Sequence, residues 1–156
     1  MCSGIGRLLP VMALALAAAC GGEAANEQSA AAVAGGEAAA PAPHRAVVIT
    51  SPTDGAIVDG PSVRVLMEAH GLTVVPAGDS TPNSGHLHLF LDRDLSPAEI
   101  PIPTEPGFIV HMGTGASEYT FDTVAPGEHR LIAVVGDALH IPVRPWLVDT
   151  VRFTVR

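Results

Sequence analysis

The stretch Ser84-Gly85-His86-Leu87-His88-Leu89-Phe90-Leu91-Asp92 alternates between two kinds of side chain. Successive side chains of a β-strand point to opposite faces, so His86, His88 and Phe90 share one face and the three leucines share the other. Histidines two residues apart on a strand have Cα atoms roughly 6.5–7 Å apart. Such a pair commonly offers two nitrogen ligands to one metal ion. The stretch therefore predicts a strand that packs through its leucines and carries a candidate site on its other face.

Further strands are expected on both sides of this one. The chain has 16 glycines and 14 prolines, which favours short strands joined by turns, and it shows no helical periodicity. Ser51-Pro52-Thr53-Asp54-Gly55, for example, has the residues of a tight turn. With residues 84–92, the expected strands are 46–50, 62–70, 108–112, 118–124, 129–135 and 150–155. About seven short strands predict an all-β fold, an immunoglobulin-like antiparallel β-sandwich, over residues 46–156.

The net charge of −8 bears on possible partners. Proteins that bind nucleic acid present a basic face to the phosphates, and an acidic chain with eight arginines and no lysine does not suit that role. We therefore expect no nucleic-acid partner.

Residues 1–19 have the features of a secretory signal peptide. An apolar run at 8–19 follows Arg7 and is too short to span a membrane. Its end, Leu16-Ala17-Ala18-Ala19-Cys20, resembles the bacterial lipobox, in which the cysteine is lipidated and becomes the mature N-terminus, although Leu is usual at the position of Ala17. The alternative is an ordinary signal peptide cut at an Ala-x-Ala site. Cleavage before Cys20 leaves one cysteine, which cannot form a disulfide within the chain.

A lipidated Cys20 predicts a protein held on a membrane of the bacterial cell envelope, facing the periplasm. Gly21 after the cysteine favours the outer membrane over the inner one. Residues 20–45 are mostly Ala, Gly, Glu, Ser and Pro, with almost no large apolar side chain. Such a segment buries too little surface to offset its ordering entropy, so we expect a disordered, lipid-anchored linker.

Three later histidines extend the candidate site. His111 ends an expected strand, His129 begins one, and His140 lies in an expected loop at 137–147. Imidazoles without thiolates favour Cu(II), Zn(II) or Ni(II) over Ca(II) or Mg(II). The candidate metal set is therefore His86, His88, His111, His129 and His140, and the expected ion is Cu or Zn.

Asp92, Asp137 and His129 could have other roles than that of a main ligand. Asp92 falls on the His86 face, and Asp137 begins the loop of His140, so each is a candidate ligand or acceptor for a ligand's second N–H. His129 follows Pro126-Gly127-Glu128 at a corner where immunoglobulin-like folds place a hydrogen-bonded Tyr. For His129 a structural role at that corner is favoured over a ligand role.

Three functional classes remain open. The favoured one is an envelope module that binds Cu or Zn through His86 and His88 with His111 or His140. The second is a non-metal structural or ligand-binding sandwich whose histidines bond to the protein itself. The third, a metal-dependent enzyme, has little support, because no general base stands beside the histidines and no Gly-x-Ser-x-Gly motif is present.

Several motifs in a fixed order resemble the bacterial family called domain of unknown function 4399. The resemblance covers about residues 72–155 and implies secreted or lipid-anchored envelope proteins that are rich in histidine and have no established activity. Relatives tend to have additional histidines where this chain has Leu87, Ile109 and Val143. The motifs are Pro76-Ala77-Gly78, Pro82-Asn83-Ser84-Gly85-His86, 88–92, Ile100-Pro101-Ile102-Pro103, His111 with Gly113 and Gly115, Pro126-Gly127-Glu128-His129, and Gly136-Asp137 with His140 and Pro142.

Overall fold

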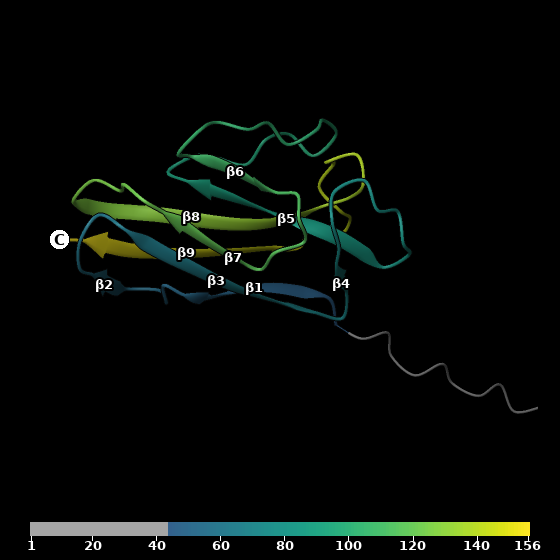
Figure 1. The fold of residues 1–156 in the computed structure, drawn as a ribbon. Helices are drawn as coiled ribbons and strands as arrows, with labels where there is room; N and C mark the ends of the chain where they lie inside the picture. The colour runs from purple at the N-terminus through teal and green to yellow at the C-terminus, as the bar shows by residue number, and fades with distance from the viewer. Residues whose placement is uncertain (1–43) are drawn as a thin grey trace, which may run out of the picture. The chain divides into compact units, whose positions relative to one another are not determined.

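The computed structural model describes residues 44–156. The predicted signal peptide (1–19), Cys20 and all but the last two residues of the predicted linker (20–45) lie outside the described residues. Within residues 44–156 the chain forms nine strands and no helix, so this part is an all-β fold (Figure 1). In the same part of the chain, no helix has the length and apolar character needed to cross a membrane.

The strands form two sheets. The smaller sheet has the order β1-β3-β7, and the larger has the order β2-β9-β8-β5-β4, with β6 also paired to β5 (Figure 1). The bounds are β1 (Ala46–Ser51), β2 (Ala56–Val58), β3 (Val63–His70), β4 (Thr73–Val74), β5 (Ser84–Leu91), β6 (Ile109–Met112), β7 (Glu118–Phe121), β8 (Gly127–Gly136) and β9 (Val148–Val155).

Each of the seven expected ranges overlaps a strand, which confirms the all-β, sandwich-like prediction. The count of seven is wrong, because β2 and β4 also form. These two strands, three and two residues long, are too short to produce a visible alternation in the sequence. Both pair in parallel, β2 with β9 and β4 with β5, whereas the seven expected strands pair with one another in antiparallel fashion.

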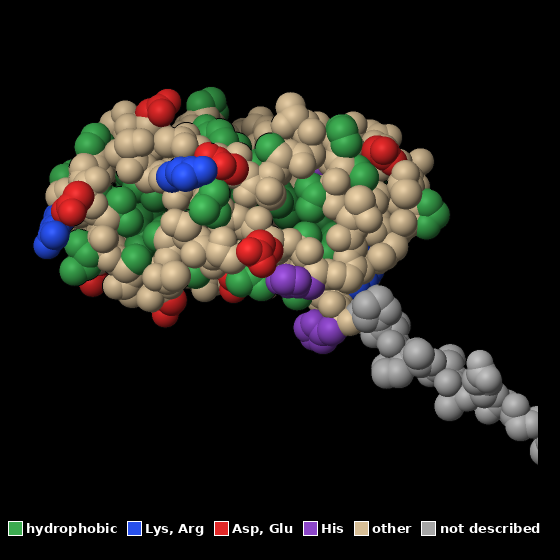
Figure 2. All heavy atoms as spheres, turned by 60° about the horizontal axis from the view of Figure 1, so that its bottom comes forward, with side chains coloured by type: hydrophobic (Ala, Val, Ile, Leu, Met, Phe, Trp, Pro, Cys, Tyr) green, Lys and Arg blue, Asp and Glu red, His purple; other side chains and the backbone are tan. Residues whose placement is uncertain are grey.

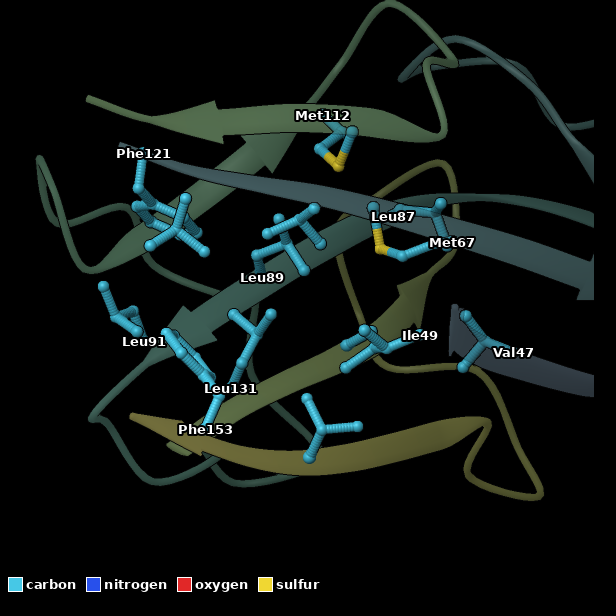
Figure 3. Close-up of a cluster of buried hydrophobic side chains, with 14 of the residues drawn as sticks. Val47, Ile49, Met67, Leu87, Leu89, Leu91, Met112, Phe121, Leu131 and Phe153 are labelled. Carbon is cyan, nitrogen blue, oxygen red and sulfur yellow. The ribbon is translucent and has the colours of Figure 1, made fainter. Parts of the chain in front are cut away.

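The main core lies between the two sheets. Leu87, Leu89 and Leu91 of β5 all point into it, as their alternation predicts, and Leu131 of β8 and Phe153 of β9 lie beside them (Figure 3). Each fully buried side chain of this size contributes about 1.5–3 kcal/mol to folding. The opposite sheet contributes Val47, Ile49, Val63, Val65, Met67 and Phe121.

The other face of β5 is buried as well. Phe90 and, from β8, Ile132 and Val134 pack beneath Ile102 of the proline-containing connection 95–107, and Ile109 of β6 completes this second cluster. β5 is therefore covered on both faces, and every residue from Gly85 to Leu91 is buried. This places the His86 and His88 side chains, which share the Phe90 face, in the interior of the fold.

A side chain also joins the two sheets at one edge. The backbone N–H of Ile49 in β1 donates to Oδ2 of Asp149 in β9 at 2.7 Å. On the face drawn in Figure 2, acidic and basic side chains are scattered without a large patch of either sign. Ion pairs of exposed residues such as Arg64 with Glu118 contribute little to stability because water and salt screen them.

We predict that Leu89→Ala lowers the free energy of unfolding by about 2–5 kcal/mol, because it leaves a cavity at a fully buried position. Urea denaturation followed by circular dichroism measures the change. Ile57→Ala is the matched control: this side chain is 62% exposed, and the expected change is within about 0.5 kcal/mol. Equal losses in the two variants would contradict the assignment of the core.

Candidate metal centre

Strand pairing brings three of the histidines together. His86 and His88 lie on one face of β5, and β6 pairs with β5 in a register that sets His111 directly opposite His88. Side chains opposite each other in adjacent strands share a face, so His111 joins the two imidazoles of β5. His140 reaches them from the loop that follows β8. The structure thus gathers four histidines from three segments.

The four rings form a compact group. The six distances between ring centroids run from 4.6 Å, between His111 and His140, to 5.8 Å, between His88 and His140. The Nε2 atoms of His86 and His88 are 3.0 Å apart, and those of His111 and His140 are 3.2 Å apart. The four imidazoles therefore lie in one cluster, and their Nε2 atoms point toward one another in two pairs.

Three of the four can share one ion. One nitrogen each from His86, His111 and His140 can be chosen so that all lie within 4.8 Å of one another. His88 is not a member of this group of three, although its Nε2 touches that of His86. Among the described residues, this group contains no cysteine, aspartate or glutamate. The set is therefore one of neutral imidazole donors.

The distances suit a transition metal. In a tetrahedral site with metal–nitrogen bonds of about 2.0–2.1 Å, neighbouring ligand nitrogens are about 3.3–3.4 Å apart. Within the group of three, Nε2 of His111 and Nε2 of His140 are 3.2 Å apart, which is close to this spacing. Imidazole nitrogens suit copper, zinc and nickel. The residues present therefore fit such an ion, with His86, His111 and His140 as its candidate ligands.

Two glycines make room for the rings. A Cβ at Gly113, just after β6, would lie 2.6 Å from Cε1 of His111, and a Cβ at Gly136, at the end of β8, would lie 3.0 Å from Nε2 of His88. Any other residue at these positions would have to displace an imidazole. The sequence gives Gly113 and Gly136 no such role, because only the three-dimensional packing shows what these positions leave open.

The loop of His140 is fixed by backbone hydrogen bonds. Oδ1 of Asp137 accepts the N–H groups of Leu139 (2.8 Å) and Ile141 (2.9 Å), and the His140 N–H donates to the Asp137 carbonyl oxygen (2.9 Å). His140 itself has a φ of 67° and accepts a hydrogen bond from the Ile102 N–H through its carbonyl oxygen. Asp137 thus shapes the loop that presents His140.

Burial keeps the histidines of β5 neutral. Burial first, and the neighbouring histidines after it, lower the pKa of His86 to about 4 and that of His88 to about 3. The charge of Asp137 acts in the opposite direction on the pKa of His86. The pKa of His111 is also lowered, first by burial and then by His140. Neutral imidazoles can bind a metal without first losing a proton.

His129 and Asp92 lie outside this cluster, and they contact each other instead. His129 is on the opposite face of the sheet from His88, because His88 pairs with Val134 and odd-numbered residues of β8 point into the main core. Its ring packs against Phe153, and its Nδ1 and Nε2 lie 2.7 Å from Asp92 Oδ2 and from the Ala125 carbonyl oxygen.

Asp92 therefore belongs to a corner at the far end of β5. It has a φ of 53° and accepts the Arg130 N–H through Oδ1 at 2.9 Å. The alternation that set Asp92 on the His86 face ends where the strand ends, at Leu91. The hydrogen bonds of His129 are those expected of a structural corner residue.

Residues 65–156 match the family model described as Domain of unknown function (DUF4399). The chain belongs to this family. The matched part runs from β3 to the end of the chain and contains all four clustered histidines. Leu87 and Ile109 are buried in the two apolar clusters, and Val143 packs against the main core. The family thus gives this domain its place among known sequences without assigning an activity.

No curated protein matches the chain significantly. Among solved structures, it is similar to the crystal structure of an engineered protein, with 13% sequence identity and a TM-score of 0.42. That match covers 72% of this chain and 20% of the engineered one.

We predict that the metal-free protein loses stability as the pH falls below 6.5. Unfolded histidines take up protons near pH 6.5, whereas the folded pKa values of His86 and His88 are about 4 and 3, so the unfolded state binds more protons between these values. Each of these two histidines should lower the free energy of unfolding by about 1.5 kcal/mol between pH 6.5 and pH 5. Urea unfolding in a chelating buffer at several pH values measures this.

His88→Leu should remove about half of that pH dependence, since Leu does not titrate. The exposed histidine variant His70→Gln is the control and should keep the wild-type slope, because its side chain is 56% exposed. An unchanged slope in His88→Leu would show that His88 is not held neutral by the fold.

Proposed function

We propose that this protein is a bacterial envelope lipoprotein whose immunoglobulin-like domain binds one copper or zinc ion. The ligands are His86, His111 and His140, and His88 lies against the first of them. The observation that carries the proposal is the convergence of nitrogens from two strands and one loop to within 4.8 Å of one another. Residues separated by up to 54 positions in the sequence meet only because the fold brings them together.

Several features support a metal over a purely structural role. A hydrogen bond between two neutral imidazoles needs one donor and one acceptor nitrogen, and this fold places two such contacts in one cluster, one buried at 3.0 Å and one partly buried at 3.2 Å. The glycines at 113 and 136 leave the space that the rings occupy. By contrast, both ring nitrogens of His129 contact oxygens of the protein, Oδ2 of Asp92 and the carbonyl oxygen of Ala125.

The proposed role is metal binding rather than catalysis. The group of three contains only imidazoles, and the nearest carboxylate of its loop, Asp137, is engaged through Oδ1 with two backbone N–H groups. A base poised to activate a metal-bound water is not part of this arrangement. Storage, delivery or sensing of a metal in the envelope suits such a site.

We predict that the purified protein binds one equivalent of Cu(II) or Zn(II), and that His111→Ala and His140→Ala each weaken binding at least about tenfold, which corresponds to 1.4 kcal/mol. Each variant removes one of three donors. Isothermal titration calorimetry with a competing chelator measures the affinities. His70→Gln, a histidine outside the cluster, should bind as the wild type does.

Equal affinities in wild type and in the His111→Ala, His140→Ala double variant would contradict the proposal. The histidines would then be structural residues whose Nε2 contacts are hydrogen bonds, which is the second functional class open from the sequence.

The envelope location rests on Cys20, which we propose to be lipidated and to hold the protein on the periplasmic side of the outer membrane. In a bacterial host, the mature N-terminal peptide should begin at Cys20 and carry acyl chains, and the protein should enter the detergent phase. Mass spectrometry and detergent partitioning measure this. Cys20→Ala should abolish both properties, whereas Cys2→Ala should leave them unchanged. An unmodified N-terminus after cleavage at an Ala-x-Ala site would refute the anchor.

A further inference from the structure

His88 differs from the other three clustered histidines. Its side chain is fully buried, and its Nδ1 has no hydrogen-bond partner. A metal-bound imidazole normally donates its second N–H to an acceptor, which fixes the ring and strengthens the ligand. If Nε2 of His88 binds a metal, the proton sits on Nδ1 and remains buried and unpaired, which costs free energy. The position of His88 therefore allows it to bind a metal, but the unpaired N–H weakens the bond that it can form.

The position of His88 agrees with this. Its ring centroid is 5.8 Å from that of His140, the longest distance in the cluster, and the ring is not part of the group of three. Its Nε2 nevertheless lies 3.0 Å from Nε2 of His86, so a small movement is enough to join or leave an ion held there. The missing Cβ of Gly136, beside Ile102, leaves the ring its space.

The two oxidation states of copper prefer different numbers of ligands. Cu(I) has a filled d shell and is satisfied by three imidazoles, whereas Cu(II) prefers four donors in a tetragonal arrangement. Neutral ligands leave the full ionic charge in the site, and a buried charge is costly, so the +1 ion is favoured over the +2 ion. A weak fourth donor therefore changes the affinity of the site for Cu(II) more than its affinity for Cu(I).

We propose that His88 is a conditional fourth ligand: His86, His111 and His140 hold Cu(I), and His88 joins them when the ion is Cu(II). This inference rests on the proposed metal-binding function and narrows its metal to copper. Removal of the His88 nitrogen should destabilise the Cu(II) form alone and raise the midpoint potential of the bound copper.

The test compares the wild type with His88→Leu in the full-length protein. The affinity for Cu(I), measured with a colorimetric chelator under reducing conditions, should change by less than about threefold. The affinity for Cu(II) should fall at least tenfold, which corresponds to a rise of at least about 59 mV in the one-electron midpoint potential. X-ray absorption should find three nitrogen ligands on Cu(I) in both proteins, and four on Cu(II) in the wild type only.

Controls separate the two proposals. His140→Ala should weaken binding of both oxidation states, and His70→Gln should change neither. If the wild type binds neither copper ion nor zinc, the proposed function fails. If the wild type binds copper but His88→Leu weakens both states equally, or neither, the conditional role is refuted and the metal site stands. Should His88→Leu not fold, His88→Phe, which keeps a ring without nitrogen, replaces it.

Discussion

The structure depends on the burial of one strand from both sides. The leucines of β5 pack into the core between the sheets, and its other face lies beneath the connection 95–107 and the loop after β8. Neither cover alone would take the strand out of water. Because both are present, side chains that alternation sends away from the main core, His86 and His88, are as buried as the leucines.

Burial in turn sets the chemistry of these side chains. An imidazolium is costly in the interior unless it is paired, so the fold favours the neutral form and lowers both pKa values. A neutral imidazole has one N–H donor and one nitrogen with a free lone pair. The Nε2 of His88 contacts His86, whereas its buried Nδ1 has no hydrogen-bond partner among the described residues.

The same residue type serves a different purpose at the other end of β5. His129 lies on the core face of β8, between an aspartate and a carbonyl oxygen, and ties the turn before β8 to the end of β5. The register between β5 and β8 decides the difference, because it sets His88 beside Val134 and leaves His129 five residues further along on the opposite face. A shift of one residue would exchange the faces.

The sequence by itself determined the all-β class, the place of seven strands and the two faces of β5, because local alternation and turn residues encode these directly. It offered five candidate histidines without deciding among them. It did not reveal β2 and β4, which are too short to alternate, and it set Asp92 on the face of His86, beyond the point where the strand ends. Only the tertiary structure decided which imidazoles meet, since that depends on the β5–β6 register, the loop built by Asp137 and the space left at Gly113 and Gly136. These are contacts between distant segments, and no local pattern specifies them.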